Sequence, residues 1–332
     1  MRHADTRNLQ EGERPLPMQH GNMHAVYSDI RTYRCGRKIR AMARWDEVTL
    51  YGQLAEAPLA YRAQQTEDGE LLRVIAKLTV LRGIRKFGAY DQRQKLDVLS
   101  VMSGVEKDMK EMLKWDKGDM VLVRGQLITQ NHSKHCRCVH CGHTQAYQGY
   151  SAYINPIFEY KIKSGYDPEK GLIDLRRWKE VSNRITAVGT ATADPTIHLH
   201  ETSGTWITSY KLKIDRKVRV REDAEENHCD FPVVKSYGDN AIMDHDMIRA
   251  GSMVLLDGML QSRTYDRTFT CEECGEDFKV RDYVVEIVPY STEYLKDCGD
   301  IKDYDIEKAK AQLQDAVQQM AEDDIFGNKQ ES

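Results

Sequence analysis

Apolar and polar residues alternate in several short stretches of the chain, which is the period of a half-buried β-strand. In 72–80, for example, Leu72, Val74 and Leu78 alternate with polar neighbours. Val105 and Met109 instead fall at helical spacing, and Gly118 ends that pattern. The elements expected in the first half are strands at 48–54, 72–80, 96–101, 119–129 and 147–161, and a helix at 105–113.

The second half repeats the first. The segment Val121–Leu127 recurs as Val254–Leu260, 133 positions later, and the same offset carries Cys138 onto Cys271 and Cys141 onto Cys274. Agreement at so many positions in one order indicates a duplicated unit of about 115 residues. Its second copy predicts strands at 185–190, 206–214, 229–234, 252–261 and 278–288, with a helix at 240–249.

Three strands, a helix and two more strands is the order of an OB-fold, a five-stranded Greek-key barrel that binds oligonucleotides. We therefore expect a mainly β protein with two tandem OB-fold barrels, each with a cysteine knuckle in its last hairpin. The expected division is a flexible basic N-terminal segment at 1–43, barrels at 44–163 and 181–296 joined by a linker at 164–180, and an acidic C-terminal helix and tail at 297–332.

Composition agrees with a globular chain. Of the 332 residues, 40% are hydrophobic and 30% are charged, so wholly disordered and collagen-like classes are excluded. The formal net charge of −4 shows no global attraction to polyanions. No apolar run approaches the roughly 20 residues that a membrane span needs, and the first 20 residues hold no apolar signal segment, so we expect a cytoplasmic protein.

Several segments resemble bacterial and phage single-stranded DNA-binding proteins. They are 183–189 with Pro195, and 230–238, 250–265 and 283–295. The resemblance covers 181–296 well and 44–163 more faintly. It implies OB barrels that bind single strands without catalysis, in replication, recombination and repair. It also implies four barrels per particle, so this two-barrel chain is expected to form a homodimer.

Candidate nucleic-acid-binding residues lie in two basic loops at matching positions of the repeats. Binding that ignores sequence needs cations along the backbone path and flat side chains on which bases stack. The alternative is that both loops are merely solvated. The loop residues are Arg82, Arg85, Lys86, Phe87, Tyr90 and Arg93 in repeat one, and Arg216, Lys217, Arg219 and Arg221 in repeat two.

Further candidates lie on the strands and hairpins. Trp206 and Tyr210 share one strand face, so they either stack bases or belong to the core. Tyr265 either stacks a base or covers its hairpin. The remaining strand candidates are the cations Arg73, Lys77, Lys211 and Lys213.

Two Cys-x-x-Cys-Gly knuckles predict a zinc site. Each knuckle is half of a tetrahedral site. One solution joins Cys138 and Cys141 to Cys271 and Cys274 across the two barrels. Another closes a site within repeat one through Cys136 or a histidine, and a third leaves the cysteines as reduced or redox-active thiols.

The C-terminal segment 321–326 is similar to the acidic, Phe-containing tails by which single-stranded DNA-binding proteins recruit replication and repair proteins. The candidate partner-binding residues are Asp323, Asp324, Ile325 and Phe326. Residues 327–332 follow, which that family's tails lack, so a solvated helix end is the alternative.

The sequence contains no phosphate loop, nucleophile elbow, zinc-protease helix or deaminase pattern, which are signatures of catalysis. We therefore expect no enzyme. Two other functions stay open, an RNA-binding OB protein and a structural or scaffolding subunit of a replication complex.

Overall fold

The computed structural model describes residues 45–63, 69–83, 95–216, 229–300 and 304–327, with side chains up to residue 319. In repeat one the elements are β1 (Trp45–Leu54), β2 (Leu59–Arg62), β3 (Leu71–Leu81), β4 (Leu96–Ser103), α2 (Glu106–Met112), β5 (Met120–Arg137) and β6 (Thr144–Lys163). Repeat two contains β7 (Asn183–Ala191), β8 (Thr196–His200), β9 (Thr205–Asp215), β10 (Cys229–Asp230), β11 (Val233–Tyr237), α5 (Asp239–Met247), β12 (Met253–Thr270) and β13 (Asp277–Lys296). Between the repeats lie α3 (Pro168–Arg177) and α4 (Lys179–Ser182), and α6 (Ile306–Gly327) ends the described chain.

Each repeat closes into a five-stranded barrel. In repeat one, β1 pairs with both β3 and β5, while β6 pairs with β5 and, in parallel, with β4. Repeat two has the same closure, because β7 pairs with both β9 and β12 and β13 pairs with β12 and with β11. This is the expected OB order, so the predicted mainly β fold with two tandem barrels is confirmed. The short strands β2 and β8 were not expected.

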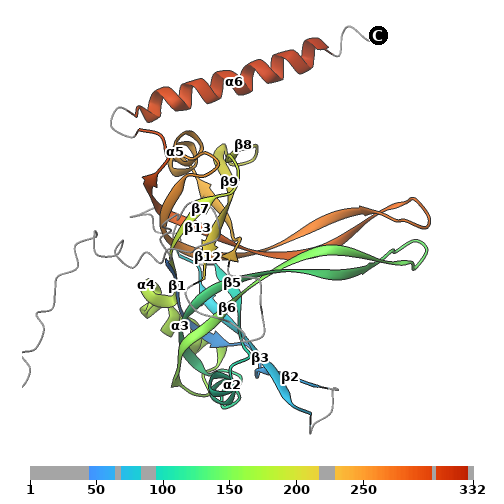
Figure 1. The fold of residues 1–332 in the computed structure, drawn as a ribbon, viewed down its shortest axis with the longest axis vertical. Coiled ribbons are helices and arrows are strands. Elements are labelled where there is room, and N and C mark those ends of the chain that lie inside the picture. Colours follow the sequence, from blue (N-terminus) through green and yellow to red (C-terminus); the bar gives the residue numbers. More distant parts are fainter. Residues whose placement is uncertain (1–44, 64–68, 84–94, 217–228, 301–303, 328–332) are drawn as a thin grey trace, which may run out of the picture. The chain divides into compact units, whose positions relative to one another are not determined.

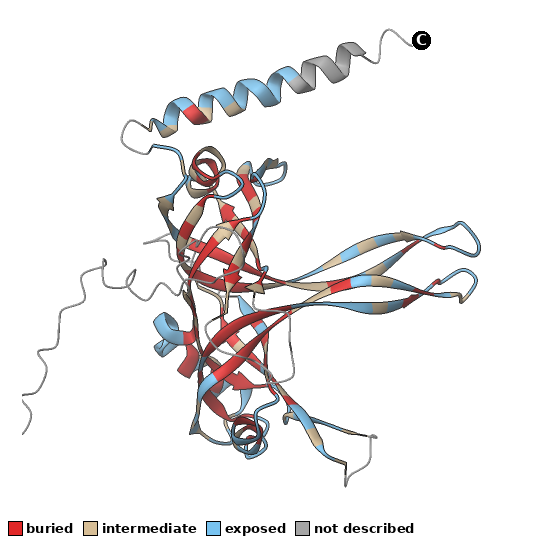
Figure 2. Ribbon diagram, viewed as in Figure 1, coloured by how far each residue is buried: buried red, intermediate tan, exposed pale blue. Residues whose placement is uncertain are grey.

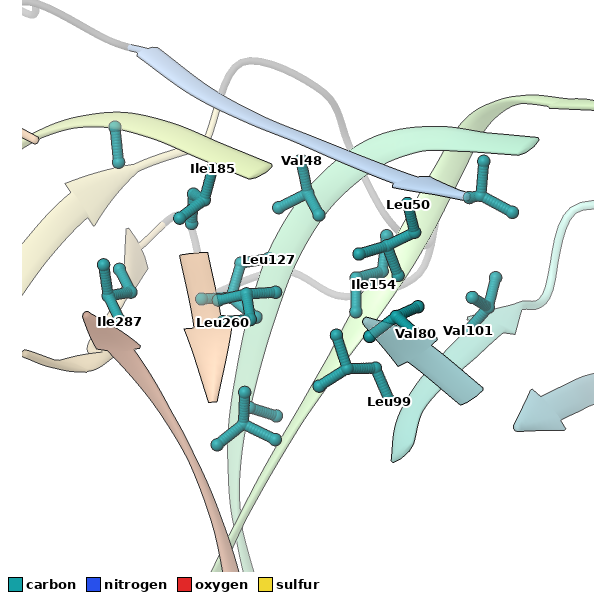
Figure 3. Packing of buried hydrophobic residues seen from close by; sticks show 14 of the residues in the cluster. Val48, Leu50, Val80, Leu99, Val101, Leu127, Ile154, Ile185, Leu260 and Ile287 are labelled. Atoms are coloured by element: carbon teal, nitrogen blue, oxygen red, sulfur yellow. The ribbon is translucent and has the colours of Figure 1, made fainter. Parts of the chain in front are cut away.

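The two barrels share one continuous sheet. Strands β1 and β7 pair antiparallel from Trp45 opposite Val188 to Leu50 opposite Asn183, which joins the barrels into a 13-stranded sheet. Buried residues of both repeats therefore belong to one core, and Figure 3 shows Val48 and Ile185 on adjacent strands within it. The repeats are thus joined by backbone hydrogen bonds and by packing.

The segment expected to be a linker contains a helix. Asp167 caps α3 by accepting a hydrogen bond from the backbone N–H of Lys170 at 2.8 Å, and Pro168 occupies the first turn. Leu175 on this helix is buried, and Asp174 accepts hydrogen bonds from Tyr51 and from Lys163. Residues 168–177 are therefore packed on barrel one.

The hairpins β5–β6 and β12–β13 continue beyond the barrels as two arms (Figure 1, green and orange). Figure 2 shows that most arm residues are exposed, with buried positions where the two arms face each other. Helix α6 contacts barrel two through Ala309 and Leu313, next to Ile242 of α5. No helix in the described part of the chain is long and apolar enough to cross a membrane.

Candidate nucleic-acid interface and cysteine cluster

Much of the two basic loops lies outside the described residues. Arg85, Lys86, Phe87, Tyr90 and Arg93 lie outside the described residues, as do Lys217, Arg219 and Arg221. These eight residues remain candidates from sequence alone. The structure does describe the first candidate residue of each loop, which is Arg82 in repeat one and Arg216 in repeat two.

Arg82 is held at the junction of the repeats. Its Nε and Nη2 donate to the two carboxylate oxygens of Asp97 at 2.8 and 2.6 Å. The Asp97 carboxylate is completely buried, and it also accepts hydrogen bonds from the backbone N–H and the hydroxyl of Ser262, in repeat two, at 2.8 and 2.9 Å. A bidentate Arg–carboxylate pair of this kind is strong and directional.

Arg216 makes the equivalent contacts, here with repeat two supplying the Arg–Asp pair and repeat one the third residue. Its Nε and Nη2 donate to Asp230 at 2.6 and 2.7 Å, and the Asp230 carboxylate is also completely buried. Asp230 accepts hydrogen bonds from the backbone N–H and the hydroxyl of Thr129, in repeat one, at 2.6 and 3.3 Å. We call these two Arg–Asp–hydroxyl sets the junction clasps.

The junction clasps correct the prediction for these two arginines. The side chains of Arg82 and Arg216 are only 18% and 10% exposed, and the guanidinium of each is already paired with a buried carboxylate. Both arginines hold the repeats together, so we no longer expect them to bind phosphate.

Trp206 and Tyr210 are likewise no longer candidate nucleic-acid-binding residues. Trp206 is buried with Ala241 and Ile242 of α5. Tyr210 is buried in the main core and its hydroxyl donates to Asp244 at 3.1 Å. Burial, together with the Asp244 charge, raises the pKa of Tyr210 well above its usual value. The core alternative for both aromatic side chains is therefore the correct one.

The four predicted strand cations point away from the barrel cores. Lys211 and Lys213 alternate on β9 with the buried residues Tyr210, Leu212 and Ile214, and both reach solvent. In repeat one, Arg73 and Lys77 occupy the outward positions of β3; Arg73 lies over the Tyr61 ring at 5.6 Å, and Lys77 pairs with Glu56 at 2.9 Å. Each barrel thus carries two of these cations on its outer face.

The neighbouring strand of barrel two adds aromatic residues that sequence reasoning missed. Phe231 is 41% exposed at the end of β10, and Tyr237 lies half-buried on β11, directly opposite Ile207 of β9. Lys235 lies between them on β11 and pairs with Glu286 at 3.2 Å. The signal was available, because Lys235 must face outward and Tyr237, two residues further along the strand, lies on the same face.

Tyr265 lies where the arm of repeat two leaves the barrel. Its ring is half-buried, and the Arg263 guanidinium lies 5.6 Å from its centroid. The ring thus partly covers its hairpin while one part reaches solvent.

The four knuckle cysteines come together at the ends of the two arms. The sulfur atoms of Cys138, Cys141, Cys271 and Cys274 all lie within 4.8 Å of one another. Cys141 Sγ lies 3.5 Å from Cys271 Sγ, and Cys138 Sγ lies 3.8 Å from Cys274 Sγ. Sulfurs bound to one tetrahedral zinc at about 2.3 Å lie about 3.8 Å apart, so the cluster fits such an ion.

Backbone geometry at both knuckles supports this fit. The N–H of Gly142 bonds the carbonyl of Cys138, and the N–H of Gly275 bonds the carbonyl of Cys271, each at 3.0 Å. Both glycines have a positive φ, 78° and 75°, which closes the tight turn. The N–H of His140 also donates to Cys138 Sγ at 3.4 Å, as a thiolate ligand requires. These four cysteines therefore could hold a metal, whereas Cys136 is not among them.

The arms also contact each other below the cluster. Cys136, Phe278 and Phe269 pack with Tyr147 in a small apolar core, and Arg267 lies over the rings of Tyr147 and Phe269 at 5.2 and 5.0 Å. Polar contacts flank this arm core. Lys134 pairs with Asp282 at 2.7 Å, and the Gln145 amide donates to the Thr270 carbonyl at 3.2 Å.

The C-terminal candidates lie at the end of α6. The backbone of Asp323, Asp324, Ile325 and Phe326 is helical, and their side chains lie outside the described residues. No contact is assigned to them.

Comparison with known proteins gives one consistent result. The model of the Single-strand binding protein family matches residues 182–288, in repeat two. Single-stranded DNA-binding protein 1 of Clostridium acetobutylicum is 32% identical over 100 residues, which is 29% of this chain and 89% of that protein. The Single-stranded DNA-binding protein of Clostridium tetani is 28% identical over 114 residues, 34% of this chain and 70% of that protein. The chain belongs to the single-strand binding protein family.

Solved structures agree on the fold. The wild-type single-stranded DNA binding protein from Thermus aquaticus covers 79% of this chain and 97% of its own length, with a TM-score of 0.51 and 14% identity. A deletion mutant of the same protein gives a TM-score of 0.52 over 79% of this chain. At this identity the likeness concerns the fold alone, and it extends across both repeats.

Proposed function

We propose that this protein binds single-stranded DNA without catalysis and protects transient single strands during replication, recombination and repair. The observation that carries the proposal is the outer face of barrel two, where Lys211 and Lys213 lie on the strand beside exposed Phe231 and half-buried Tyr237. Family membership supports the same activity, since the relatives are named as single-stranded DNA-binding proteins.

The outer face has both parts that such binding needs. Ammonium groups attract the phosphate backbone, and each base stacked on an aromatic ring contributes about 1–3 kcal/mol. Arg73 and Lys77, with Tyr61, provide a second, similar face on barrel one. The loop residues that lie outside the described chain, from Arg85 to Arg93 and from Lys217 to Arg221, extend these faces in our proposal, and so does Tyr265.

Fluorescence anisotropy with labelled oligonucleotides tests the proposal. The full chain should bind a thymidine oligomer more tightly than a duplex or an RNA of equal length, and the affinity should fall as salt rises. Preference for the RNA would favour the RNA-binding alternative. No salt-sensitive affinity for any of the three would favour the scaffolding alternative.

We further propose that the four-cysteine cluster holds one zinc ion as a structural link between the repeats. The support is the common position of the four sulfurs and the supply of two ligands by each arm. Zinc bound by four thiolates leaves no open position and contributes to folding. Zinc binding by Cys138 and Cys141 would thus require Cys271 and Cys274 as well. The geometry does not support the alternative of a site within repeat one that uses Cys136.

Elemental analysis of the purified chain should find about one zinc per chain. The Cys138→Ser/Cys141→Ser and Cys271→Ser/Cys274→Ser variants should both lose it, because two thiolates hold structural zinc weakly. Cys136→Ser is the matched control and should retain the metal. Retention by the Cys271/Cys274 variant alone would instead assign the site to repeat one, and wild-type protein without metal would contradict the zinc proposal.

We propose that two chains form a homodimer with four barrels. The support is an apolar strip on β6, where Ile157, Phe158 and Tyr160 are 53%, 50% and 57% exposed. Phe158 pairs with Arg124, and its equivalent in repeat two is Ser291, which pairs with Asp257. Repeat one thus has an exposed apolar strip that repeat two lacks.

Light scattering should give the mass of a dimer at micromolar concentration. Phe158→Asp should shift the mass toward monomer, and Ser291→Asp, at the equivalent position, should leave it unchanged. Monomer mass for the wild-type chain would contradict the proposal.

We make two further proposals from the family resemblance. The tail residues Asp323, Asp324, Ile325 and Phe326 would recruit replication or repair proteins, and deleting 321–332 should then abolish their co-purification while leaving affinity for DNA intact. A protein with this function would act in the cytoplasm of a prokaryotic or phage-infected cell, at the nucleoid.

A further inference from the structure

The shortest distances in the cysteine cluster join one arm to the other. Cys141 and Cys271 are 3.5 Å apart and Cys138 and Cys274 are 3.8 Å apart, measured between sulfur atoms. A disulfide needs about 2.05 Å between its sulfurs, so each pair lacks less than about 2 Å, which side-chain rotation supplies.

Accessibility divides each of these pairs in the same way. Cys141 and Cys274 are exposed, whereas Cys138 and Cys271 are buried. Each pair between the arms therefore combines one thiol that an oxidant in solution can reach with one thiol that it cannot. An exposed cysteine beside a second thiol is the arrangement in which a first oxidation product is converted into a disulfide.

The arms hold this geometry by contacts that do not involve the four sulfurs. The arm core of Phe269, Phe278 and Tyr147 lies below the cluster, and Lys134 pairs with Asp282 between the arms. The two pairs thus stay close together whether or not a metal ion is bound.

We propose that the cluster is an oxidation site at which hydrogen peroxide forms two disulfides between the arms, Cys141 with Cys271 and Cys138 with Cys274. Peroxide transfers one oxygen to the exposed thiol, which gives a sulfenic acid and one water. The buried thiol then attacks the sulfenic sulfur, the S–S bond forms, and the hydroxyl leaves with the thiol proton as a second water. Each peroxide takes the two electrons that one pair of thiols loses.

The reaction would have two consequences for the molecule. Disulfide sulfurs are no longer thiolate ligands, so a zinc ion held by the cluster leaves. The two repeats become covalently joined through their arms. The inference extends the proposed metal site, but it rests on the four thiols and does not depend on DNA binding.

Peptide mapping distinguishes disulfides between the arms from disulfides within a knuckle. Trypsin places Cys138 and Cys141 in peptide 138–161, and Cys271 and Cys274 in peptide 268–279. The full chain is treated with peroxide, free thiols are blocked, and the chain is digested without reductant. We expect the two peptides to appear joined by mass spectrometry and to separate after dithiothreitol. Separate peptides that each carry an internal disulfide, or sulfinic acids, would overturn the proposal.

Double variants test which pairs form. Cys141→Ser/Cys271→Ser and Cys138→Ser/Cys274→Ser each keep one proposed pair and should still give joined peptides. Cys141→Ser/Cys274→Ser keeps only the two buried thiols and should react about tenfold more slowly. An equal rate would contradict the role of the exposed cysteines. The wild-type map decides the main point even if a variant fails to fold, and binding of the thymidine oligomer, measured separately, reports on the proposed function alone.

Discussion

The two repeats share the buried junction clasps and differ on their outer faces. Both carry a junction clasp in which a loop arginine, a completely buried aspartate and a hydroxyl of the other repeat meet. On the outer face, by contrast, Phe231 of barrel two stands where barrel one has Val98, 133 positions earlier. Duplication has thus preserved what joins the barrels, while the exposed surface has diverged.

The difference between the outer faces predicts that the two barrels contribute unequally to the binding of single strands. Lys213 of barrel two corresponds to Thr79, and Lys77 of barrel one is paired with Glu56. Arg73 of barrel one already lies on the Tyr61 ring. Barrel two therefore presents more available charge next to two aromatic rings, Phe231 and Tyr237, and we expect it to contribute more of the affinity for single strands.

The largest predicted effect concerns the junction clasps, which both repeats contain. Asp97→Ala or Asp230→Ala leaves a largely buried arginine without its carboxylate, and each should lower the free energy of unfolding by about 3–5 kcal/mol. Urea denaturation measures this loss. Because the two clasps have the same geometry, the two variants should agree within about 1 kcal/mol.

Arg184→Gln is the matched control for the clasps. Arg184 pairs with Asp257 at 2.7 Å, but its side chain is 48% exposed. An exposed ion pair contributes about 0–1 kcal/mol, so this variant should be nearly neutral. A clasp variant as mild as this control would show that Arg82 and Arg216 are not structural.

The next largest effect should show that the outer faces of the two barrels contribute unequally to the affinity for single strands. Lys211→Gln/Lys213→Gln removes two phosphate contacts, each of which contributes about −0.7 to the log–log salt slope, so affinity for a thymidine oligomer should fall about 20-fold at 0.1 M salt. Arg73→Gln/Lys77→Gln should cost only about fivefold, because Lys77 is already paired. Equal losses, measured by anisotropy over a salt series, would contradict the predicted inequality.

Sequence reasoning recovered the fold and the cysteine cluster for physical reasons. The duplication predicted the strand order twice, and because each knuckle is half of a tetrahedral site, a cluster joining both knuckles was one of the expected solutions. It failed for Arg82 and Arg216, because a basic residue at the start of a basic loop is typical of a phosphate ligand. The available signal was that Arg82 and Asp97 recur together as Arg216 and Asp230.

Two other failures have different causes, a tertiary contact and a local signal that was overlooked. Trp206 shares a strand face with Tyr210, but only the packing of α5 over Trp206 shows that it belongs to the core. The helix at 168–177 was missed even though Asp167 before Pro168 is a typical helix start.

A smaller effect concerns one position at which the repeats differ inside the core. Asp46 of repeat one corresponds to Asn183, which exchanges two hydrogen bonds with the backbone of Leu260 at 2.7 and 2.9 Å. Asp46 lies beside the equivalent Leu127, and its Oδ1 has no partner. Burial raises the pKa of Asp46 from 3.8 to about 8, so the folded protein keeps this carboxyl protonated near neutral pH.

Asp46→Asn should therefore stabilise the protein. Between pH 3.8 and about 8 the folded state holds a proton that the unfolded chain has lost, so the wild-type free energy of unfolding falls as pH rises through this window. The gain of the variant should be about 1 kcal/mol or more at pH 7, absent near pH 4 and constant above about pH 8. Thermal unfolding across this pH range checks it, and a gain that does not change with pH would contradict the assignment.

Photochemical cross-linking tests the central claim most directly, that single strands lie on the outer face of barrel two. A thymidine oligomer bound to the full chain is irradiated, and the cross-linked peptides are identified by mass spectrometry. We predict cross-links at Phe231 and Tyr237, and fewer at Tyr61 of barrel one. Cross-links confined to Phe158 and Tyr160 on β6 would place the nucleic acid on another face and contradict the account.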